Sequence, residues 1–236
     1  MADHPLPTKP PELRIHTATA GDATAGIAAG WELFKKAPGP WIGILVVFFL
    51  INLAAGLLPI AGPTAMAVLG PVFTFGWLSG AADLDAGRRL TLGHLFAGFG
   101  NPVRNSLILL GAISLLASVA MALIAVSAIG GVAPGTVEVA PFSLLVLLIL
   151  LVPVIAAFLF ATPLVGFDRL PIATALRLSF NASFRNWLAL LVWSLLALAL
   201  ILVGALTFGL GLLVVVPVLT ASYYRLYQAI FPIPQS

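Results

Sequence analysis

The chain contains no cysteine and few charged residues. Without cysteine it cannot form a disulfide, a thiolate metal site, an iron-sulfur cluster or a cysteine nucleophile. Asp, Glu, Lys and Arg make up 8% of the residues, whereas soluble domains carry about 25%, so a soluble fold is excluded. The net charge of +3 comes from 11 basic and 8 acidic residues. This small imbalance gives no basic face, and we expect no nucleic-acid partner.

Catalytic signatures are missing as well. The sequence has no His-Glu-x-x-His, no Gly-x-Ser-x-Gly and no glycine-rich phosphate loop with lysine, which are the patterns of common hydrolases and nucleotide-binding proteins. We therefore predict that the protein is not an enzyme and has no catalytic residue, metal or cofactor. The long apolar runs also lack carboxylates, which argues against a proton-driven carrier, because such carriers commonly use intramembrane carboxylates.

Apolar residues are what the chain has in excess, at 61% of its length. Six runs are long enough to cross a hydrocarbon core of ~30 Å as helices. Helices are required because lipid offers no partner to backbone N–H and C=O groups. The sequence therefore predicts an all-α fold, a polytopic membrane helix bundle with six transmembrane helices, at about 41–60, 64–82, 106–130, 142–167, 187–205 and 210–229.

The first part of the chain differs from the rest. Residues 1–24 are rich in Pro, Thr and Ala and have no apolar periodicity, which predicts a disordered cytoplasmic tail. Residues 25–236 then form a single six-span membrane domain.

The basic residues predict the orientation of these spans. Every Lys and Arg lies before span one, between spans two and three, between spans four and five, or near the end of span six, where Arg225 stands. The opposite links, near 59–63, 131–141 and 206–209, contain only Glu138 as a charged residue. Short loops rich in Lys and Arg stay cytoplasmic. We expect a multi-pass protein of the bacterial inner membrane with both termini in the cytoplasm.

Spans one, three and five are each preceded by a segment with apolar residues at helical spacing. Ile27, Trp31 and Phe34 form the first stripe, Leu92 to Phe99 the second, and Ile172 to Phe180 the third. Such amphipathic helices lie flat at a membrane surface. The interfacial anchors predicted in these segments and at the span starts are Trp31, Phe34, Trp41, Phe96, Phe180 and Trp187.

Equal spacings indicate an internal threefold repeat. Thirty residues separate Trp41 from Pro71 and also Trp187 from Pro217, and Pro153 holds the matching place in a longer middle unit. Each repeat would consist of an interfacial amphipathic helix followed by a helical hairpin. A proline frees a carbonyl in mid-membrane, so the three prolines either kink closely packed helices or line a substrate path between repeats.

One charged cluster stands at the cytoplasmic end of span two. It contains Asp83, Asp85, Arg88 and Arg89, with His94 nearby. Asp-x-Asp is similar to the start of a calcium loop, but the third oxygen ligand is missing and His94 stands where a bidentate Glu is required. We favour a solvated turn whose charges pair locally and whose arginines meet anionic headgroups.

Small and amide residues inside the spans predict packing contacts. Asn52 is the one amide deep in a span, and it is expected to hydrogen-bond across helices because an unpaired amide in lipid is costly. Contact with a substrate is the alternative. Gly76 and Gly80 give span two a small-residue face that packs within the molecule or between copies.

Three segments carry a family resemblance: Trp31-Glu-Leu-Phe-Lys-Lys, Leu95-Phe-Ala-Gly-Phe99, and Ala175-Leu to Ser179 with Arg185-Asn-Trp187. They resemble an uncharacterised family of bacterial six-span inner-membrane proteins. More distantly, they resemble the membrane region of some glycerophosphodiester phosphodiesterases. The resemblance covers about residues 25–230. Because the catalytic phosphodiesterase domain has no counterpart in these segments, that activity is not carried over, and the resemblance implies a multi-pass membrane protein of unknown role.

Three classes of function are consistent with the sequence. The first is a non-enzymatic protein that interacts with lipid, a membrane partner complex or a second copy of itself. The second is a transporter or channel for a neutral or amphiphilic solute. The third is an enzyme acting on lipid headgroups through Asp83, Asp85 and His94. We favour the first because the small-residue faces and interfacial helices are present and catalytic signatures are absent.

Overall fold

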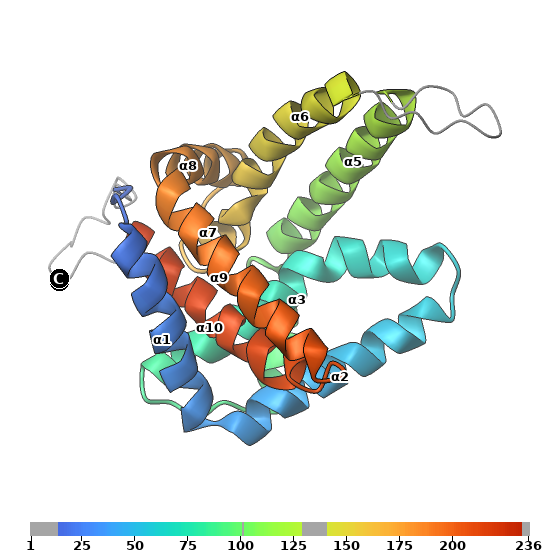
Figure 1. Ribbon diagram of the computed structural model, residues 1–236. Helices are drawn as coiled ribbons and strands as arrows, with labels where there is room; N and C mark the ends of the chain where they lie inside the picture. The colour runs from blue at the N-terminus through green and yellow to red at the C-terminus, as the bar shows by residue number, and fades with distance from the viewer. Residues whose placement is uncertain (1–13, 101, 129–140, 233–236) are drawn as a thin grey trace, which may run out of the picture.

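A computed structural model describes residues 14–100, 102–128 and 141–232. Within these ranges every regular element is a helix (Figure 1), which confirms the all-α prediction. The elements are α1 (Ala20–Lys36), α2 (Pro38–Gly56), α3 (Ala61–Asp85), the 3-10 helix η1 (Leu92–Phe96), α4 (Ala97–Gly100), α5 (Arg104–Ala128), α6 (Pro141–Leu159), α7 (Ala161–Gly166), α8 (Ile172–Arg185), α9 (Trp187–Leu206) and α10 (Leu212–Ile230).

Five stretches are long and apolar enough to cross a membrane: α2, α3, α5, the α6–α7 stretch from Leu147 to Gly166, and α9. They coincide with the first five predicted spans, so the protein is a multi-pass membrane protein. The sixth predicted span falls on α10, which is as long as α2 but less apolar because it contains Arg225, Gln228 and three tyrosines.

The outer helices present large apolar side chains to their surroundings, while α10 lies inside. Phe49 on α2, Leu116 on α5 and Leu202 on α9 are each more than half exposed. By contrast, nine of the α10 side chains are buried. α10 contributes to both apolar clusters of the core, and its contacts include α1, α2, α3 and α9. The exposed helices have the surface that lipid requires.

Helical structure begins before residue 24, where the predicted tail ends. The first helix begins at Ala20, because the Thr19 side chain accepts from the Asp22 backbone N–H at 3.2 Å. The Asp22 carboxylate in turn accepts from the Thr19 backbone N–H at 2.7 Å. This is a capping box. The segment before it is held as well, since the His16 N–H donates to the Ile230 carbonyl at 2.9 Å. Residues 14–24 are therefore not a disordered tail, and residues 1–13 lie outside the described ranges.

The three predicted amphipathic segments are helical, and small residues form most of the packing faces of α1 and α8. On α1 the buried face consists mainly of Ala23, Gly26, Gly30 and Leu33, while Trp31 is 44% exposed. A Cβ added at Gly30 would lie 2.5 Å from the Val218 carbonyl oxygen of α10. Small residues therefore make up most of the inner face of α1, where they let helix backbones approach closely.

Small residues also form the packing face of α8. On α8 the buried face is Ala175, Ser179, Ala182 and Ser183, and Phe180 is exposed. Each segment packs on a proline-bearing helix: α1 on α10, η1 and α4 on α3, and α8 on α6. The helices themselves continue through Pro71, Pro153 and Pro217.

The predicted aromatic anchors divide into two groups. Trp31, Phe96, Phe180 and Trp187 are exposed, as an interfacial position requires. Phe34 and Trp41 are buried, and Trp41 stacks on Trp77 with ring centroids 6.1 Å apart. These two residues pack the core between α2 and α3 and do not face headgroups.

Candidate functional site

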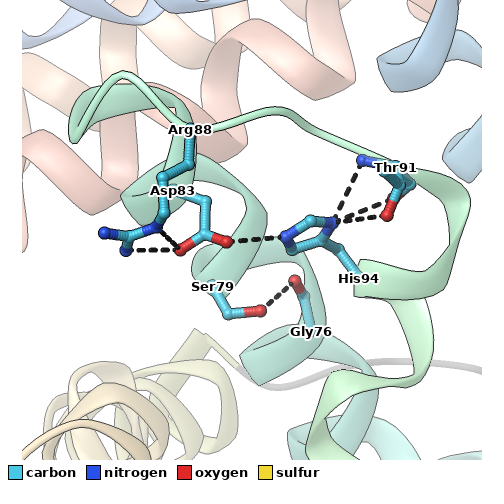
Figure 2. Close-up of polar contacts among 6 residues, drawn as sticks. All are labelled: Gly76, Ser79, Asp83, Arg88, Thr91 and His94. Carbon is cyan, nitrogen blue, oxygen red and sulfur yellow. Dashed lines mark hydrogen bonds and ion pairs between the residues drawn. The ribbon is translucent and has the colours of Figure 1, made fainter.

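The carboxylate of Asp83, in the last turn of α3, is the centre of a polar cluster (Figure 2). One oxygen, Oδ1, accepts from Arg88 Nε at 3.0 Å and from Arg88 Nη2 at 2.6 Å. The other, Oδ2, lies 2.9 Å from His94 Nε2. The bond with this carboxylate holds the pKa of Arg88 above its ordinary value. Local charge pairing, predicted from the sequence, is confirmed for Asp83 and Arg88.

The turn before η1 fixes the histidine ring. The Thr91 backbone N–H lies 3.1 Å from His94 Nδ1, and a backbone N–H can only donate. Nδ1 is therefore the acceptor in this bond, and in the neutral ring Nε2 carries the proton and donates to Asp83. Glycine positions η1 here, since a Cβ at Gly76 would lie 2.5 Å from the His94 carbonyl oxygen. The small-residue face predicted at Gly76 and Gly80, which lies on α3, therefore packs within the molecule.

Asp85 points to a different partner. Its carboxylate accepts from Arg225 Nη2 on α10 and from Gln228 Nε2 at 3.4 Å. Gln228 also donates to the Tyr224 hydroxyl at 2.7 Å. Local pairing within the turn is wrong for Asp85, whose partner is 140 residues away in the sequence.

The polar cluster at the end of α3 holds neighbouring helices together. Asp83 and Asp85 connect α3 to η1 and to α10, and Lys36 of α1 donates to the Leu84 carbonyl at 3.4 Å. Arg89, the fourth predicted member, is exposed. Among the described residues no three His, Asp or Glu side chains are grouped to hold a metal ion. Since both carboxylates are engaged by cations, neither is placed as a free general base.

A helix break between α6 and α7 forms the second unusual feature. The Ser179 hydroxyl of α8 inserts between the Ala156 carbonyl and the Phe160 N–H, accepting from Phe160 at 2.8 Å and donating to Ala156 at 2.8 Å. Ser183 also donates to the Ala156 carbonyl, at 3.1 Å. A side chain inserted into the i to i−4 ladder is a recognised cause of helix kinks. The break is thus made by α8, seven residues beyond Pro153.

An apolar groove of about 460 Å³ lies beside this break, between α6 and α9. α6 ends near α8 and α9 starts near it, and the two helices diverge from there (Figure 1). The groove is lined by Val152, Ile155, Ala156, Leu159, Ser183, Phe184, Trp187, Leu190, Leu191, Trp193, Ser194, Tyr223 and Leu226.

Hydroxyl groups in the groove wall all donate to protein carbonyls. Ser183 donates to Ala156, Ser194 to Leu190, and Tyr223 to Leu159. The Trp193 indole N–H donates to the Ser222 hydroxyl at 2.8 Å. The wall therefore offers hydrocarbon and no unused donor, which suits an apolar occupant and is costly for a polar one.

A second cavity of about 370 Å³ lies between α2, α3 and α10, with Trp193 of α9 at its wall. Its lining residues include Thr74, Trp77, Thr220 and Tyr223. None of the three predicted path prolines, Pro71, Pro153 or Pro217, lines this cavity or the groove.

Comparison with known proteins found no relative of this chain. No family model matches the chain, and searches of curated proteins and of solved structures found no match.

Sequence reasoning missed several residues that shape the groove. Ser179, Ser183 and Asn186 appeared only within motifs. Tyr223 was expected to belong to a cytoplasmic aromatic anchor of the last span, whereas its hydroxyl donates to the Leu159 carbonyl at the α6–α7 break. Polar side chains spaced on the small-residue face of α8 were the available signal. Asn52, expected to bond across helices, donates instead to the Phe48 carbonyl of its own helix at 2.8 Å.

Proposed function

We propose that this chain is a non-enzymatic multi-pass membrane protein that binds lipid, with an acyl chain in the groove between α6 and α9. One observation carries the proposal: the groove wall has a continuous apolar lining, and its hydroxyl donors are already engaged. Hydrocarbon is the surrounding medium of these helices, and an acyl chain needs no hydrogen-bond partner.

The proposed topology has six spans, in the bacterial inner membrane, with both termini cytoplasmic. The contact between His16 and Ile230 supports it, because the described ends of the chain lie together. A chain that starts and ends on one side crosses the membrane an even number of times, which favours α10 as a sixth crossing. Lys36, Arg88 and Arg225 also gather around the end of α3, as expected for a cytoplasmic end.

The packing also supports a three-unit organisation. Each unit would contain an interfacial segment and a hairpin, and each interfacial segment packs on the proline-bearing helix of the preceding unit. α1 closes the series by packing on α10. Gly30 approaches the Val218 carbonyl, one residue after Pro217, and Gly98 approaches the Val72 carbonyl, one residue after Pro71.

The competing classes have weaker support. Transport of a polar solute would need an accessible polar lining, and the prolines expected to line a path lie outside both cavities. Headgroup chemistry at Asp83, Asp85 and His94 would need the two acids to converge, but they bind different cations. A protein partner, a second copy, and the resemblance to the six-span family remain predictions from the sequence.

Replacement of Ser194 by phenylalanine tests the proposal, because Ser194 lies on the groove wall and is exposed. We would extract wild-type protein and S194F into native lipid particles and measure the phospholipid that stays bound after delipidating washes. The variant is expected to retain less. S118F is the matched control, since Ser118 on α5 is exposed and likewise bonds a carbonyl four residues earlier. Equal retention by wild type and S194F would overturn the proposal.

A further inference from the structure

The exposed face of α8 combines cations with aromatic rings. Arg177, Phe180, Phe184 and Arg185 are all exposed. Positions 177, 180 and 184 follow one another at helical spacing and share one face. The rings of Phe180 and Phe184 are in contact, with centroids 4.7 Å apart. This is the composition of a helix that dips aromatic rings into acyl chains and holds its cations at the phosphate level.

The two arginines have no carboxylate partner within the described part of the chain. The acidic side chains there bind other groups: Asp22 bonds with Thr19, Glu32 with Lys35, Asp83 with Arg88 and His94, Asp85 with Arg225, and Asp168 with Tyr227. Arg177 and Arg185 are therefore available to an external anion, and a guanidinium binds phosphate through two parallel N–H donors.

The C-terminal end of this cationic face adjoins the groove. Ser183 and Phe184 of α8 and Trp187 at the start of α9 all line the groove, and Arg185 stands between them in sequence. From Trp187 the lining continues along α9 to Ser194, which corresponds to about 10 Å of helix. The site is therefore basic at the membrane surface and apolar at depth.

We infer that the groove between α6 and α9 binds an anionic glycerophospholipid, with its phosphate held by Arg177 and Arg185 and one acyl chain against α6 and α9. The inference rests on the proposed lipid binding and names the class of lipid. Charge complementarity selects this occupant. A helix of a second copy or of another protein would fill the apolar part but would leave the two guanidinium groups without an anion.

Photo-cross-linking of two lipids distinguishes the headgroup from the acyl chain. Phosphatidylglycerol and phosphatidylcholine carrying the same diazirine-bearing acyl chain would be incorporated separately into nanodiscs with the full chain. Mass spectrometry of peptides covering 152–159 and 187–194 then reports groove labelling. We expect phosphatidylglycerol to label these peptides more strongly, because each cation near an anionic surface strengthens binding roughly fivefold.

Removal of the cations should abolish this preference. In R177Q/R185Q we expect the advantage of phosphatidylglycerol to fall by on the order of tenfold, with phosphatidylcholine labelling retained. R104Q, a change of an exposed arginine at the start of α5, should keep the preference.

The outcomes that contradict the two proposals differ. Equal labelling of the wild-type groove by the two lipids, or a preference that survives in R177Q/R185Q, would overturn the headgroup assignment and leave lipid binding intact. Absence of groove labelling by either lipid would overturn both.

Discussion

Individual small residues decide where the helices of this protein touch. Gly30, Gly76 and Gly98 each bring a helix within contact of another backbone, while Phe49 and Leu116 stand exposed. The reason is physical: lipid tails are as apolar as leucine, so burying a large side chain against another helix brings little hydrophobic gain in a bilayer. Close backbone approach and hydrogen bonds supply the specificity in its place.

Gly30→Ala tests this at one contact. The added Cβ would lie 2.5 Å from the Val218 oxygen and 2.7 Å from the Ser222 nitrogen, both backbone atoms of α10. Overpacking of this kind costs about 1–3 kcal/mol, so the thermal unfolding midpoint in nanodiscs should fall. Gly70→Ala is the control, because nothing lies within 4 Å of its added Cβ. A midpoint for G30A equal to that of wild type would show that the contact is loose.

Asp168 gives a pH-dependent prediction. Burial raises the pKa of this carboxyl, against the opposing effect of the bond from the Tyr227 hydroxyl. A raised pKa in the folded state favours the protonated form there, so its stabilising contribution is present at acidic pH and is lost as pH rises through the raised pKa. Asp168→Asn should therefore unfold at a higher temperature than wild type at pH 7, with the difference shrinking toward pH 4. A larger advantage at pH 4 would contradict the assignment.

At the scale of elements, the α6–α7 break shows how one helix shapes another. Ser179 takes the place of the direct bond between the Ala156 carbonyl and the Phe160 N–H. Tyr223 of α10 supports the same turn through the Leu159 carbonyl. The direction of α6, and with it the opening of the groove, depends on these hydroxyls.

Ser179→Ala is expected to destabilise the protein. It leaves the buried Phe160 N–H without its acceptor, which costs about 1–3 kcal/mol, while Ser183 still serves the Ala156 carbonyl. The free energy of unfolding in mixed detergent should drop accordingly. Ser194→Ala is the comparison, since that hydroxyl bonds only within its own helix on an exposed face and should be nearly neutral. Equal stability of S179A and S194A would refute the role of the inserted hydroxyl.

Element boundaries could be predicted from the sequence because they follow uninterrupted apolar runs. The span expected at 187–205 is Trp187–Leu206, and that at 64–82 is Ala61–Asp85. The break at Phe160 could not be predicted, because its cause is a hydroxyl 19 residues away. The inner face of α1 could not be predicted from its apolar stripe for a related reason. Apolar periodicity ranks residues by hydrophobicity, whereas this contact selects them by size.

At the scale of the whole molecule, hydrogen bonds join the first and last described segments of the chain to the junction of α8 and α9. The fully buried Asn186, between α8 and α9, accepts from the Ala18 N–H at 2.6 Å and donates to the His16 carbonyl at 3.1 Å. The His16 N–H in turn reaches Ile230 at the end of α10. This places the segment before α1 against both α8 and α10.

Asn186→Ala should release that segment. Without the amide, the Ala18 N–H and the His16 carbonyl lose their partners, so hydrogen exchange over residues 14–20 should speed up markedly while α3 stays protected. Asn181→Ala, at an exposed position of α8, should leave exchange unchanged. If N186A exchanges like wild type, the tie does not hold the segment.

The candidate site could be predicted only in part. The Asp83–Arg88 pair was accessible from sequence because its partners are five residues apart in one turn. The Asp85–Arg225 pair spans the fold, and the groove exists only where α6 and α9 diverge from α8. Neither follows from local spacing, since both depend on how distant helices pack.

The most direct test of lipid binding is a crystal structure of the full chain grown from a lipidic mesophase doped with phosphatidylglycerol. We expect continuous acyl-chain density against Val152, Ile155 and Leu191, leading to a phosphate within hydrogen-bond distance of Arg177 or Arg185. A groove closed by direct contact of α6 with α9, or filled by a polypeptide helix, would contradict the proposed function.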